Sequence, residues 1–443
     1  MNCLLINSPL FREPTKAEEE DYLPSLGLGI IANSCRANNL NVDYIDAIFE
    51  RRSIDDLIVT INEGNYCSVG MNIFTVNVHL VQEIVERVKA KTKFIIGGLS
   101  TRSLLPKIHE WKTQNDLHVV FGDGEKIFPM IANETIDFSS FRSKNVFYYE
   151  VNQNSPFYVS NIGDFVPDRT LFKNEPFLNV HGKVEACIVT SRGCIYNCAF
   201  CAAARSLNRD LTIRISSPEA ISSEITNILK SEPSIQSIRV LDDLYLKDKI
   251  SFNHAIQTFS AFPIEWRAMA HVGSIKMMSD EDLINLKRSG CSELFIGVES
   301  GSKEVLKSIH KISDVSKIEI QINRLFASQI NVKAYFIYGF PNETEEQMGH
   351  TLKLAENLAN LAHRNGAKFR TSVFQFRPYH GTQLYHEIFG SNANHSIAEA
   401  TLDQKMSSRV GRAQFNFTSG NYSNVEDNVI RDYIAATLAL SMV

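Results

Sequence analysis

Three cysteines near the middle of the chain are the residues best suited to chemistry. They occur in Cys194-Ile195-Tyr196-Asn197-Cys198-Ala199-Phe200-Cys201, a C-x3-C-x2-C spacing. Thiolates select zinc, copper(I) or iron–sulfur clusters. Because an iron–sulfur cluster usually takes four cysteines, a compact group of three predicts a cluster with one iron left open for a ligand.

A zinc site and three unligated cysteines are the alternatives. Structural zinc requires a fourth Cys or His nearby, and the segment contains none. Cys187 lies seven residues before Cys194 in an apolar run, where a buried core cysteine is the ordinary expectation. The spacing therefore favours the cluster over both alternatives.

The segment also resembles the signature of the radical S-adenosylmethionine (SAM) superfamily, in which an aromatic residue precedes the last cysteine. The resemblance implies a 4Fe–4S cluster on Cys194, Cys198 and Cys201, whose open iron binds the amino and carboxylate groups of SAM. It implies reductive cleavage of SAM to a 5′-deoxyadenosyl radical, which abstracts a hydrogen atom from a substrate. Phe200 would then form a wall near the nucleoside.

Six strand–helix units follow residue 185. Strands are expected at 186–190, 236–241, 264–270, 293–298, 332–338 and 369–376, and helices at 217–230, 248–260, 280–289, 302–309, 314–328 and 343–364. Six units rather than eight predict an incomplete (β/α)6 barrel, whose chemistry gathers at the carboxyl ends of the strands. The cysteine segment follows the first strand and so lies on that face.

By resemblance, the other strand ends hold SAM. The candidates are Asp243, Glu299, Ser300, Gly301 and Gly339. Glu299 would accept hydrogen bonds from the ribose, with a structural helix-start carboxylate as the alternative. Gly301 and Ser302 would begin a helix whose N–H groups favour an anion. Gly339 lies in Tyr338-Gly339-Phe340-Pro341-Asn342-Glu343-Thr344, which matches the family's turn beside adenine.

His271, Tyr338 and Tyr379 are the catalytic candidates. His271 stands where relatives commonly have an arginine, and it would carry a proton or orient substrate; a buried structural histidine is the alternative. Tyr338 ends the fifth predicted strand. Tyr379 belongs to Arg377-Pro378-Tyr379-His380-Gly381-Thr382, which matches the family's sixth strand end.

The N-terminal part of the chain predicts a doubly wound, Rossmann-like α/β domain. Strands at 3–7, 42–46, 68–72, 94–97 and 117–121 alternate with helices at 26–40, 53–62 and 77–91. Ligands bind at the carboxyl ends of the strands in such sheets. Two Gly-rich turns, Gly97-Gly98 and Gly122-Asp123-Gly124-Glu125, stand at those ends.

These turns, together with Pro24-Ser25-Leu26-Gly27-Leu28, resemble the cobalamin-binding domain found ahead of many radical SAM cores. The resemblance implies cobalamin as a cofactor and a set of binding residues: Leu26, Gly97, Gly98, Gly122, Gly124 and Glu125. Glycines let backbone approach a flat ligand, and ordinary loop glycines are the alternative.

The D-x-H-x-x-G motif that supplies a histidine to cobalt in other cobalamin proteins is absent. The nearest match ends in Phe121, so His118 is expected to be a strand residue. Asn77 and His79 would lie beneath cobalt or would form a solvated helix start. Cobalamin occupancy therefore stays open.

The expected division is a cobalamin-binding-type domain at 1–137, a connector at 138–185, the partial barrel at 186–385 and a small helical cap at 386–443, with an amphipathic helix near 426–441. Within the connector, Val166-Pro167-Asp168-Arg169 resembles a linker motif of the same enzymes. Such a linker would hold the two domains face to face.

Composition is that of a globular protein with two or three domains. The 443 residues are 44% hydrophobic and 21% charged. A net charge of −5 argues against a general nucleic-acid binder. No secretory signal and no apolar run of membrane-spanning length is found, and the eight cysteines form no disulfide framework, so a cytoplasmic location without membrane association is expected.

The sequence therefore predicts a cobalamin-dependent radical SAM enzyme that methylates an unactivated carbon of a small-molecule or natural-product substrate. A low-potential electron donor such as a flavodoxin is implied as a partner. The alternatives are a radical rearrangement, ring contraction, epimerisation or oxidation without methyl transfer, and a non-catalytic iron–sulfur binding or sensing protein.

Overall fold

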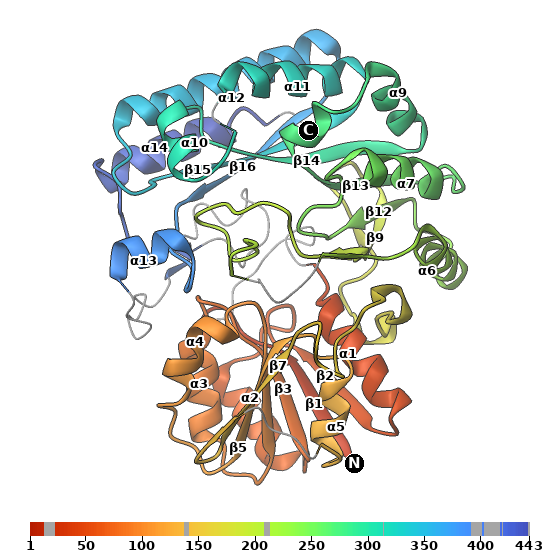
Figure 1. Cartoon of the computed structure of the whole chain (residues 1–443), viewed down its shortest axis with the longest axis vertical. Helices are drawn as coiled ribbons and strands as arrows, with labels where there is room; N and C mark the ends of the chain where they lie inside the picture. The colour runs from red at the N-terminus through yellow and green to blue at the C-terminus, as the bar shows by residue number, and fades with distance from the viewer. Residues whose placement is uncertain are drawn as a thin grey trace.

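The computed structural model describes residues 1–12, 23–136, 141–207, 213–312, 314–390, 401–402, 417–418 and 420–441. These residues form two α/β lobes, one above the other in Figure 1. Much of the helical cap expected at 386–443 lies outside the described residues. Within the described part of the chain, no helix is long and apolar enough to cross a membrane.

The N-terminal lobe is built on a seven-stranded sheet in the order β2-β1-β3-β4-β5-β7-β6. Its strands are β1 (Asn2–Asn7), β2 (Asn41–Asp46), β3 (Ser68–Asn72), β4 (Lys93–Gly97), β5 (Asp116–Gly122), β6 (Phe141–Ser143) and β7 (Val146–Val151). All neighbours are parallel except β6 and β7. The doubly wound fold is confirmed, but the boundary expected at residue 137 is too early, because β7 pairs with β5.

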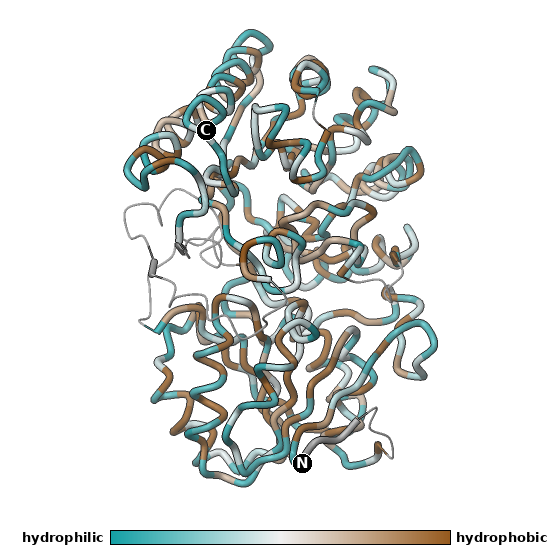
Figure 2. Tube along the Cα trace, turned by 60° about the vertical axis from the view of Figure 1, so that its left-hand side comes forward, coloured by the Kyte–Doolittle hydropathy of each residue, from teal (hydrophilic) through white to brown (hydrophobic). Residues whose placement is uncertain are grey.

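Helices cover both faces of this sheet. The helices α1 (Leu26–Ala37) and α5 (Ile127–Ala132) share one apolar cluster, and α2 (Ile54–Glu63), α3 (Val78–Arg87) and α4 (Thr101–Ile108) share another. Strand alternation explains the division, since Cys3 and Leu5 of β1 join the first cluster while Leu4 and Ile6 join the second. The strands accordingly run as brown, hydrophobic tubes through the lower lobe in Figure 2.

The second lobe contains a seven-stranded sheet in the order β16-β15-β14-β13-β12-β9-β8. Its strands are β8 (Phe177–Leu178), β9 (Val184–Ile188), β12 (Ser237–Val240), β13 (Glu265–Ala270), β14 (Cys291–Glu299), β15 (Asn331–Tyr338) and β16 (Phe369–Gln375). Six neighbouring strands are parallel, and β8 is antiparallel at the edge. The sheet ends at β16 on one side and β8 on the other, so the expected incomplete barrel is confirmed.

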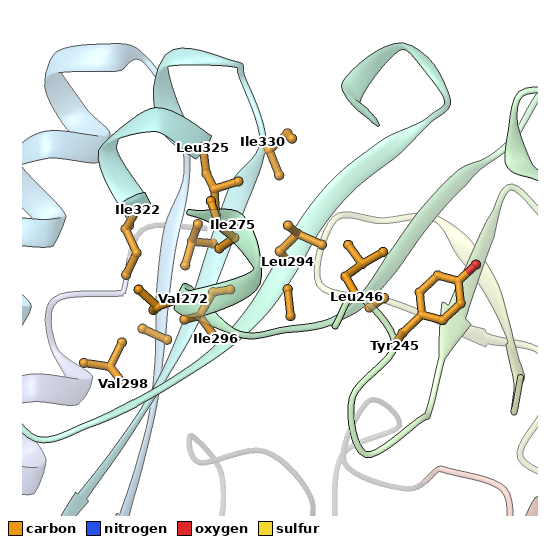
Figure 3. Close-up of a cluster of buried hydrophobic side chains, with 14 of the residues drawn as sticks. Tyr245, Leu246, Val272, Ile275, Leu294, Ile296, Val298, Ile322, Leu325 and Ile330 are labelled. Atoms are coloured by element: carbon orange, nitrogen blue, oxygen red, sulfur yellow. The ribbon is translucent and has the colours of Figure 1, made fainter. Parts of the chain in front are cut away.

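Helices pack on the outside of this sheet. They are α6 (Pro218–Ser231), α7 (Lys249–Phe259), α8 (Val272–Ile275), α9 (Asp280–Arg288), α10 (Lys303–Ser308), α11 (Val315–Ala327), α12 (Glu345–Asn365) and α14 (Asp427–Leu438). A further helix, α13 (Gln383–Phe389), follows β16, and its Leu384 N–H donates to the Ala199 carbonyl at 3.1 Å. Figure 3 shows Leu294 and Ile296 of β14 beside Ile275 of α8 and Leu325 of α11. This packing fixes the carboxyl end of β14, where Glu299 lies.

Two short helices lie between the sheets in sequence: η2 (Ile162–Asp164) and η3 (Arg169–Leu171). Two small strand pairs complete the second lobe. They are β10 (Ser191–Arg192) with β11 (Arg214–Ile215), and β17 (Thr401–Leu402) with β18 (Phe417–Thr418).

The segment at residues 166–169 contacts both lobes, as the linker resemblance implied. Asp168 forms an ion pair with Arg36 of α1, and its backbone N–H donates to the Gly29 carbonyl at 3.0 Å. The neighbouring Arg169 pairs with Glu224 of α6 at 2.7 Å. Adjacent residues of the linker therefore hold helices of different lobes.

Candidate cofactor sites

The cysteine segment is a loop anchored at both ends by hydrogen bonds. At its start, the Asp242 carboxylate accepts from the Thr190 N–H at 2.7 Å, the Thr190 hydroxyl at 2.7 Å and the Ser191 hydroxyl at 2.6 Å. At its other end, the Ala199 N–H donates to the Ile309 carbonyl, just after α10, at 3.2 Å. The loop therefore keeps its place at the carboxyl ends of the barrel strands.

The donor set of this loop fits a cluster better than a single ion. Cys194, Cys198 and Cys201 are half-buried, and burial raises the pKa of each thiol, that of Cys201 to about 12. Three thiolates here thus need compensating positive charge, as iron supplies. Within the described residues, no three Cys, His, Asp or Glu side chains converge on one metal ion. A cluster needs no such convergence, because each thiolate binds a different iron.

Lys311, which the sequence analysis missed, supplies a cation beside this loop. Its Nζ lies 3.1 Å from Glu299 Oε1 and donates to the Gly297 carbonyl at 3.2 Å. Burial lowers the pKa of Lys311, but Glu299 and the thiol of Cys198 more than offset that effect, so the pKa is raised. Lys311 stays charged next to the cysteines. No local spacing in the sequence marks it.

Three residues predicted to bind SAM, Asp243, Phe200 and Gly339, lie within the cysteine loop or at the carboxyl ends of barrel strands. Asp243 is exposed, and its charge contributes to the raised pKa of the Cys194 and Cys201 thiols. The Phe200 ring meets Phe340 edge-on, with 5.7 Å between centroids. The Gly339 N–H donates to Glu343 at 2.7 Å. Contacts of Asp243, Phe200, Gly339 and Glu299 with SAM stay predictions.

The N–H groups of Gly301 and Ser302, just before α10, already have partners within the protein. The Gly301 N–H donates to the Thr351 hydroxyl at 2.9 Å, and the Ser302 N–H donates to the Ser300 hydroxyl at 3.1 Å. Ser300 also bonds Thr351, at 3.0 Å between hydroxyl oxygens. A Cβ on Gly301 would lie 2.2 Å from the His350 carbonyl oxygen. Ser300 and Gly301 therefore serve the close packing of α12, and their groups are already bonded.

His271 occupies a structural position, which is the alternative left open for it. It caps α8, with Nδ1 accepting from the Gly273 N–H at 3.0 Å, and its ring stacks on Tyr196 at 3.9 Å between centroids. Burial, together with the Lys311 charge, lowers the pKa of His271 to about 3. The imidazole is therefore neutral near pH 7, and a direct part in catalysis stays a prediction.

The two tyrosines predicted to be catalytic have different surroundings. Tyr338 is fully buried, and its hydroxyl lies 2.7 Å from the Thr437 hydroxyl of α14. It faces the helical layer, so the catalytic prediction for Tyr338 is wrong. Tyr379 packs against Leu10 and Val76 of the N-terminal lobe, and the Cys201 thiol contributes to its raised pKa. Tyr379 thus lies between the lobes near the cysteines, and its role stays a prediction.

A pocket of about 300 Å³ opens at the carboxyl ends of β3, β4 and β5. Gly97, Gly98, Gly122, Gly124 and Glu125 line it, as predicted, together with Arg192 and Val189 of the second lobe. Its volume is near the lower end of small-molecule sites, about 300–1,000 Å³, so it accommodates one part of a large cofactor.

Leu26 was predicted to bind the cofactor, and that prediction is wrong. The side chain is buried in a cluster with Phe172, Phe177 and Cys187. Its neighbours Gly27 and Leu28 line the pocket instead. The same cluster confirms Cys187 as a core cysteine.

The glycines of the pocket fit a ligand that approaches the backbone. Gly98 and Gly122 have φ of +124° and +103°, and a Cβ there would lie 2.6 Å and 2.4 Å from carbonyl oxygens, so the turns require glycine. At Gly27 and Gly97 a Cβ would meet no protein atom within 4 Å. Protein packing does not explain these two glycines, but space for a ligand does.

Of the residues weighed for the lower face of cobalt, Asn77 is buried and His79 is half-buried, and His118, which was expected to be a strand residue, is buried in β5. His118 Nδ1 lies 2.9 Å from the Tyr149 hydroxyl, and burial lowers the pKa of His118 to about 4, so its reading as a strand residue is confirmed. Asn77 is fully buried at the start of α3 and accepts from the Phe74 N–H at 2.7 Å. The solvated helix start proposed for Asn77 is therefore wrong.

Comparison with protein families identifies both lobes. The Radical SAM superfamily matches residues 188–355, and the B12 binding domain matches residues 15–132. The chain is a radical SAM enzyme with an N-terminal B12-binding domain. A radical SAM domain implies SAM and a 4Fe–4S cluster, and a B12-binding domain implies cobalamin.

Relatives of this radical SAM enzyme include an uncharacterized methyltransferase of Pyrococcus horikoshii. It is 25% identical over 383 residues, which cover 83% of this chain and 79% of the relative. The bacteriochlorophyllide d C-12(1)-methyltransferase of Chlorobaculum tepidum is 24% identical, with 76% and 70% covered.

Solved structures share the fold of the radical SAM enzyme along its whole length. The cobalamin-dependent S-adenosylmethionine radical enzyme OxsB, with aqua-cobalamin and SAM bound, aligns with a TM-score of 0.66 and 15% identity, covering 98% of this chain and 66% of that one. The radical SAM methyltransferase TsrM from Kitasatospora setae, with cobalamin and a [4Fe-4S] cluster bound, gives 0.63 and 14%, covering 100% and 89%.

Proposed function

We propose that this radical SAM enzyme methylates a carbon atom of a small-molecule substrate in a cobalamin-dependent reaction. The observation that carries the proposal is the position of Arg192. This residue lines the glycine pocket of the B12-binding lobe, and it precedes Cys194, the first predicted cluster ligand, by two residues. The two predicted cofactor sites are therefore neighbours across the lobe interface.

The chain's own residues would divide the work as follows. When bound, the cluster and SAM supply the 5′-deoxyadenosyl radical, and cobalamin supplies the methyl carrier. Cys194, Cys198 and Cys201 would hold three irons, and the Lys311–Glu299 pair beside them would meet charged or hydroxyl groups of SAM. Tyr379, which packs against Leu10 and Val76, would exclude water where the lobes meet.

Methyl transfer is supported by the relatives that align along most of the chain. Two of them are named methyltransferases, and one is named for a carbon position of bacteriochlorophyllide d. TsrM, which shares the fold, is also a methyltransferase. We extend this outcome, though not these substrates, to the present enzyme.

The proposal is tested with anaerobically purified and reconstituted enzyme. With dithionite and SAM carrying a trideuterated methyl group, the enzyme should release 5′-deoxyadenosine, and a small-molecule extract should gain a trideuteromethylated compound only when hydroxocobalamin is present. Cys198→Ala should lose the brown chromophore and the nucleoside. Cys67→Ala, a half-buried cysteine outside the loop, should keep both.

Each contrary result favours a specific alternative. Nucleoside release with no labelled product would replace methylation by a rearrangement, ring contraction, epimerisation or oxidation. A cluster without nucleoside release would make the protein an iron–sulfur binding or sensing protein.

We also propose a flavodoxin as the low-potential donor in a cytoplasmic setting, and a flavodoxin with its reductase should replace dithionite.

A further inference from the structure

The turn Gly122-Asp123-Gly124-Glu125 contacts the second lobe as well as the pocket. Asp123 Oδ1 lies 2.9 Å from Arg192 Nη1, and Glu125 pairs with the other terminal nitrogen of Arg192. Asp123 also pairs with Arg214. One arginine of the second lobe thus bridges two carboxylates of the pocket wall.

Arg192 lies at the entrance of the cysteine loop. It forms β10 with Ser191, and β10 pairs antiparallel with β11, so that Arg192 is opposite Arg214. After Arg192, only Gly193 separates it from Cys194, and Gly193 has a φ of +89°. The chain from the ion pair to the first cysteine is therefore short.

The clamp formed by Asp123, Glu125, Arg192 and Arg214 is largely closed to solvent. The side chains of Asp123 and Glu125 are each 4% exposed, that of Arg214 is 5% exposed, and that of Arg192 is 22% exposed. Charge-assisted, paired contacts of this kind are directional as well as strong. Removing one partner would leave a buried charge uncompensated, so the four groups are expected to move together as one unit.

Arg214 fixes the carboxylate side of the clamp. Its Nη1 donates to the Val159 carbonyl at 2.6 Å, and the Val159 N–H donates to Asp123 Oδ2 at 3.1 Å. The Arg214 guanidinium also lies over the Tyr158 ring, 4.6 Å from its centroid. Unlike Arg192, Arg214 is not among the residues that line the pocket.

We propose that Arg192 is a positioning residue that couples occupancy of the glycine pocket to SAM binding at the cysteine loop. A ligand that fills the pocket rests against the turn at 122–125 and orders it. The ordered turn holds Arg192, and Arg192 holds the residues that lead into Cys194. This inference rests on the proposed function, since it takes cobalamin as the pocket ligand and SAM as the ligand of the loop.

Coupling of this kind is measurable as a ratio of dissociation constants, and it must be reciprocal. The SAM dissociation constant of the reconstituted enzyme is measured with and without saturating hydroxocobalamin, and the hydroxocobalamin constant with and without SAM. For the unchanged enzyme, each ligand should tighten the other by the same factor, on the order of 5–150. In Arg192→Gln both factors should fall to about 1.

Two variants separate the clamp from general damage. Arg192→Lys keeps the charge but offers one nitrogen in place of two, so it should retain part of the coupling. Arg102→Gln removes an exposed arginine that pairs with Glu150 at 2.9 Å on the same lobe as the pocket. This variant should retain the full coupling between the two ligands. If Arg192→Gln fails to hold its cluster, the coupling factors of Arg192→Lys and Arg214→Lys are compared with those of the unchanged enzyme instead.

The outcomes are distinct. Equal coupling factors in the unchanged enzyme and in every clamp variant would overturn the inference, even if each variant bound one ligand more weakly, because direct contact changes affinity without changing the ratio. An unchanged enzyme that binds both ligands independently would overturn it too. Failure of the unchanged enzyme to bind hydroxocobalamin or SAM at all would instead refute the proposed function.

Discussion

Glu343 should make the stability of the second lobe depend on pH. Its side chain is 1% exposed, Oε2 accepts from the N–H groups of Gly339 at 2.7 Å and Phe340 at 3.0 Å, and Oε1 has no hydrogen-bond partner among the described residues. Burial raises the pKa of Glu343 from 4.5 to about 7, although the two N–H groups lower it in part. The carboxyl group is thus destabilised in its charged form.

The direction and the magnitude of this pH effect on the free energy of unfolding follow from proton linkage. Between pH 4.5 and pH 7 the folded protein keeps a proton on Glu343 that the unfolded chain has released, so the free energy of unfolding falls as pH rises through this window. A difference of 2.5 pKa units corresponds to about 3 kcal/mol at 1.36 kcal/mol per unit. Glu343→Gln keeps an oxygen for the two N–H groups and carries no charge. It should therefore match the original protein near pH 4 and exceed its stability by up to about 3 kcal/mol at pH 8.

Denaturant unfolding of both proteins at a series of pH values, followed by the change in midpoint, measures this difference. Glu346→Gln is the matched control, because Glu346 is exposed in the first turn of α12, the helix that begins two residues after Glu343. Its effect on stability should be alike at pH 5 and pH 8. A gap between Glu343→Gln and the original protein that stays constant over this range would refute the reasoning. So would a gap that favours the original protein at pH 8.

Three further substitutions test other parts of the site. Gly97→Val should raise the hydroxocobalamin dissociation constant by about tenfold or more. It should not lower the melting temperature, because a Cβ at Gly97 would meet no protein atom within 4 Å. A lower melting temperature with unchanged binding would contradict this expectation. Tyr338→Phe should cost about 1 kcal/mol of stability through the lost bond to Thr437 and leave 5′-deoxyadenosine release intact. Lys311→Gln should cost about 3 kcal/mol in thermal unfolding because it leaves the Glu299 charge buried and unpaired, and adding Glu299→Gln should recover part of the loss.

The features that could be predicted from sequence are those whose signal is local. The six barrel strands were predicted to within about two residues, because buried apolar runs of that length read as strands without any knowledge of their partners. The cysteine loop is equally local, with three ligands inside eight residues. Four pocket glycines, Gly97, Gly98, Gly122 and Gly124, were also singled out, because they lie at or just after the carboxyl ends of β4 and β5. Gly27 of α1 and Gly70 inside β3 carry no such signal and were missed.

The contacts that escaped prediction join residues far apart in the sequence. Arg192 and Glu125 are 67 positions apart, and within the barrel Arg267 and Glu185, both fully buried, are 82 apart. In neither pair does the sequence around one residue indicate which residue is its partner. Lys311 and Glu299 are closer in sequence, but their ion pair depends on the turn after α10. That turn has no helical or strand periodicity from which the contact could be predicted.

The face on which Tyr338 lies follows from the alternation of side chains along β15. In β15, Val332, Ala334, Phe336 and Tyr338 alternate with Lys333, Tyr335 and Ile337, and the four members of the first set are all fully buried. Alternate residues of a strand share a face, so the apolar set belongs to the helical layer and takes Tyr338 with it. A residue at a strand end can therefore face the site only if its side chain lies on the inner face of the sheet.

The turn at 122–125 shows why a motif match and a residue's role need separate arguments. The resemblance assigned Gly122, Gly124 and Glu125 to cofactor binding as a group. In the structure the glycines shape the pocket wall, because a Cβ on Gly122 would lie 2.4 Å from the Val151 carbonyl oxygen, whereas Glu125 binds Arg192 of the other lobe. The backbone and the side chains of one turn thus face two partners. A change at Glu125 that weakens cobalamin binding would therefore not identify a direct contact, and only the coupling between Glu125 and Arg192, measured by combining both substitutions, would separate the two effects.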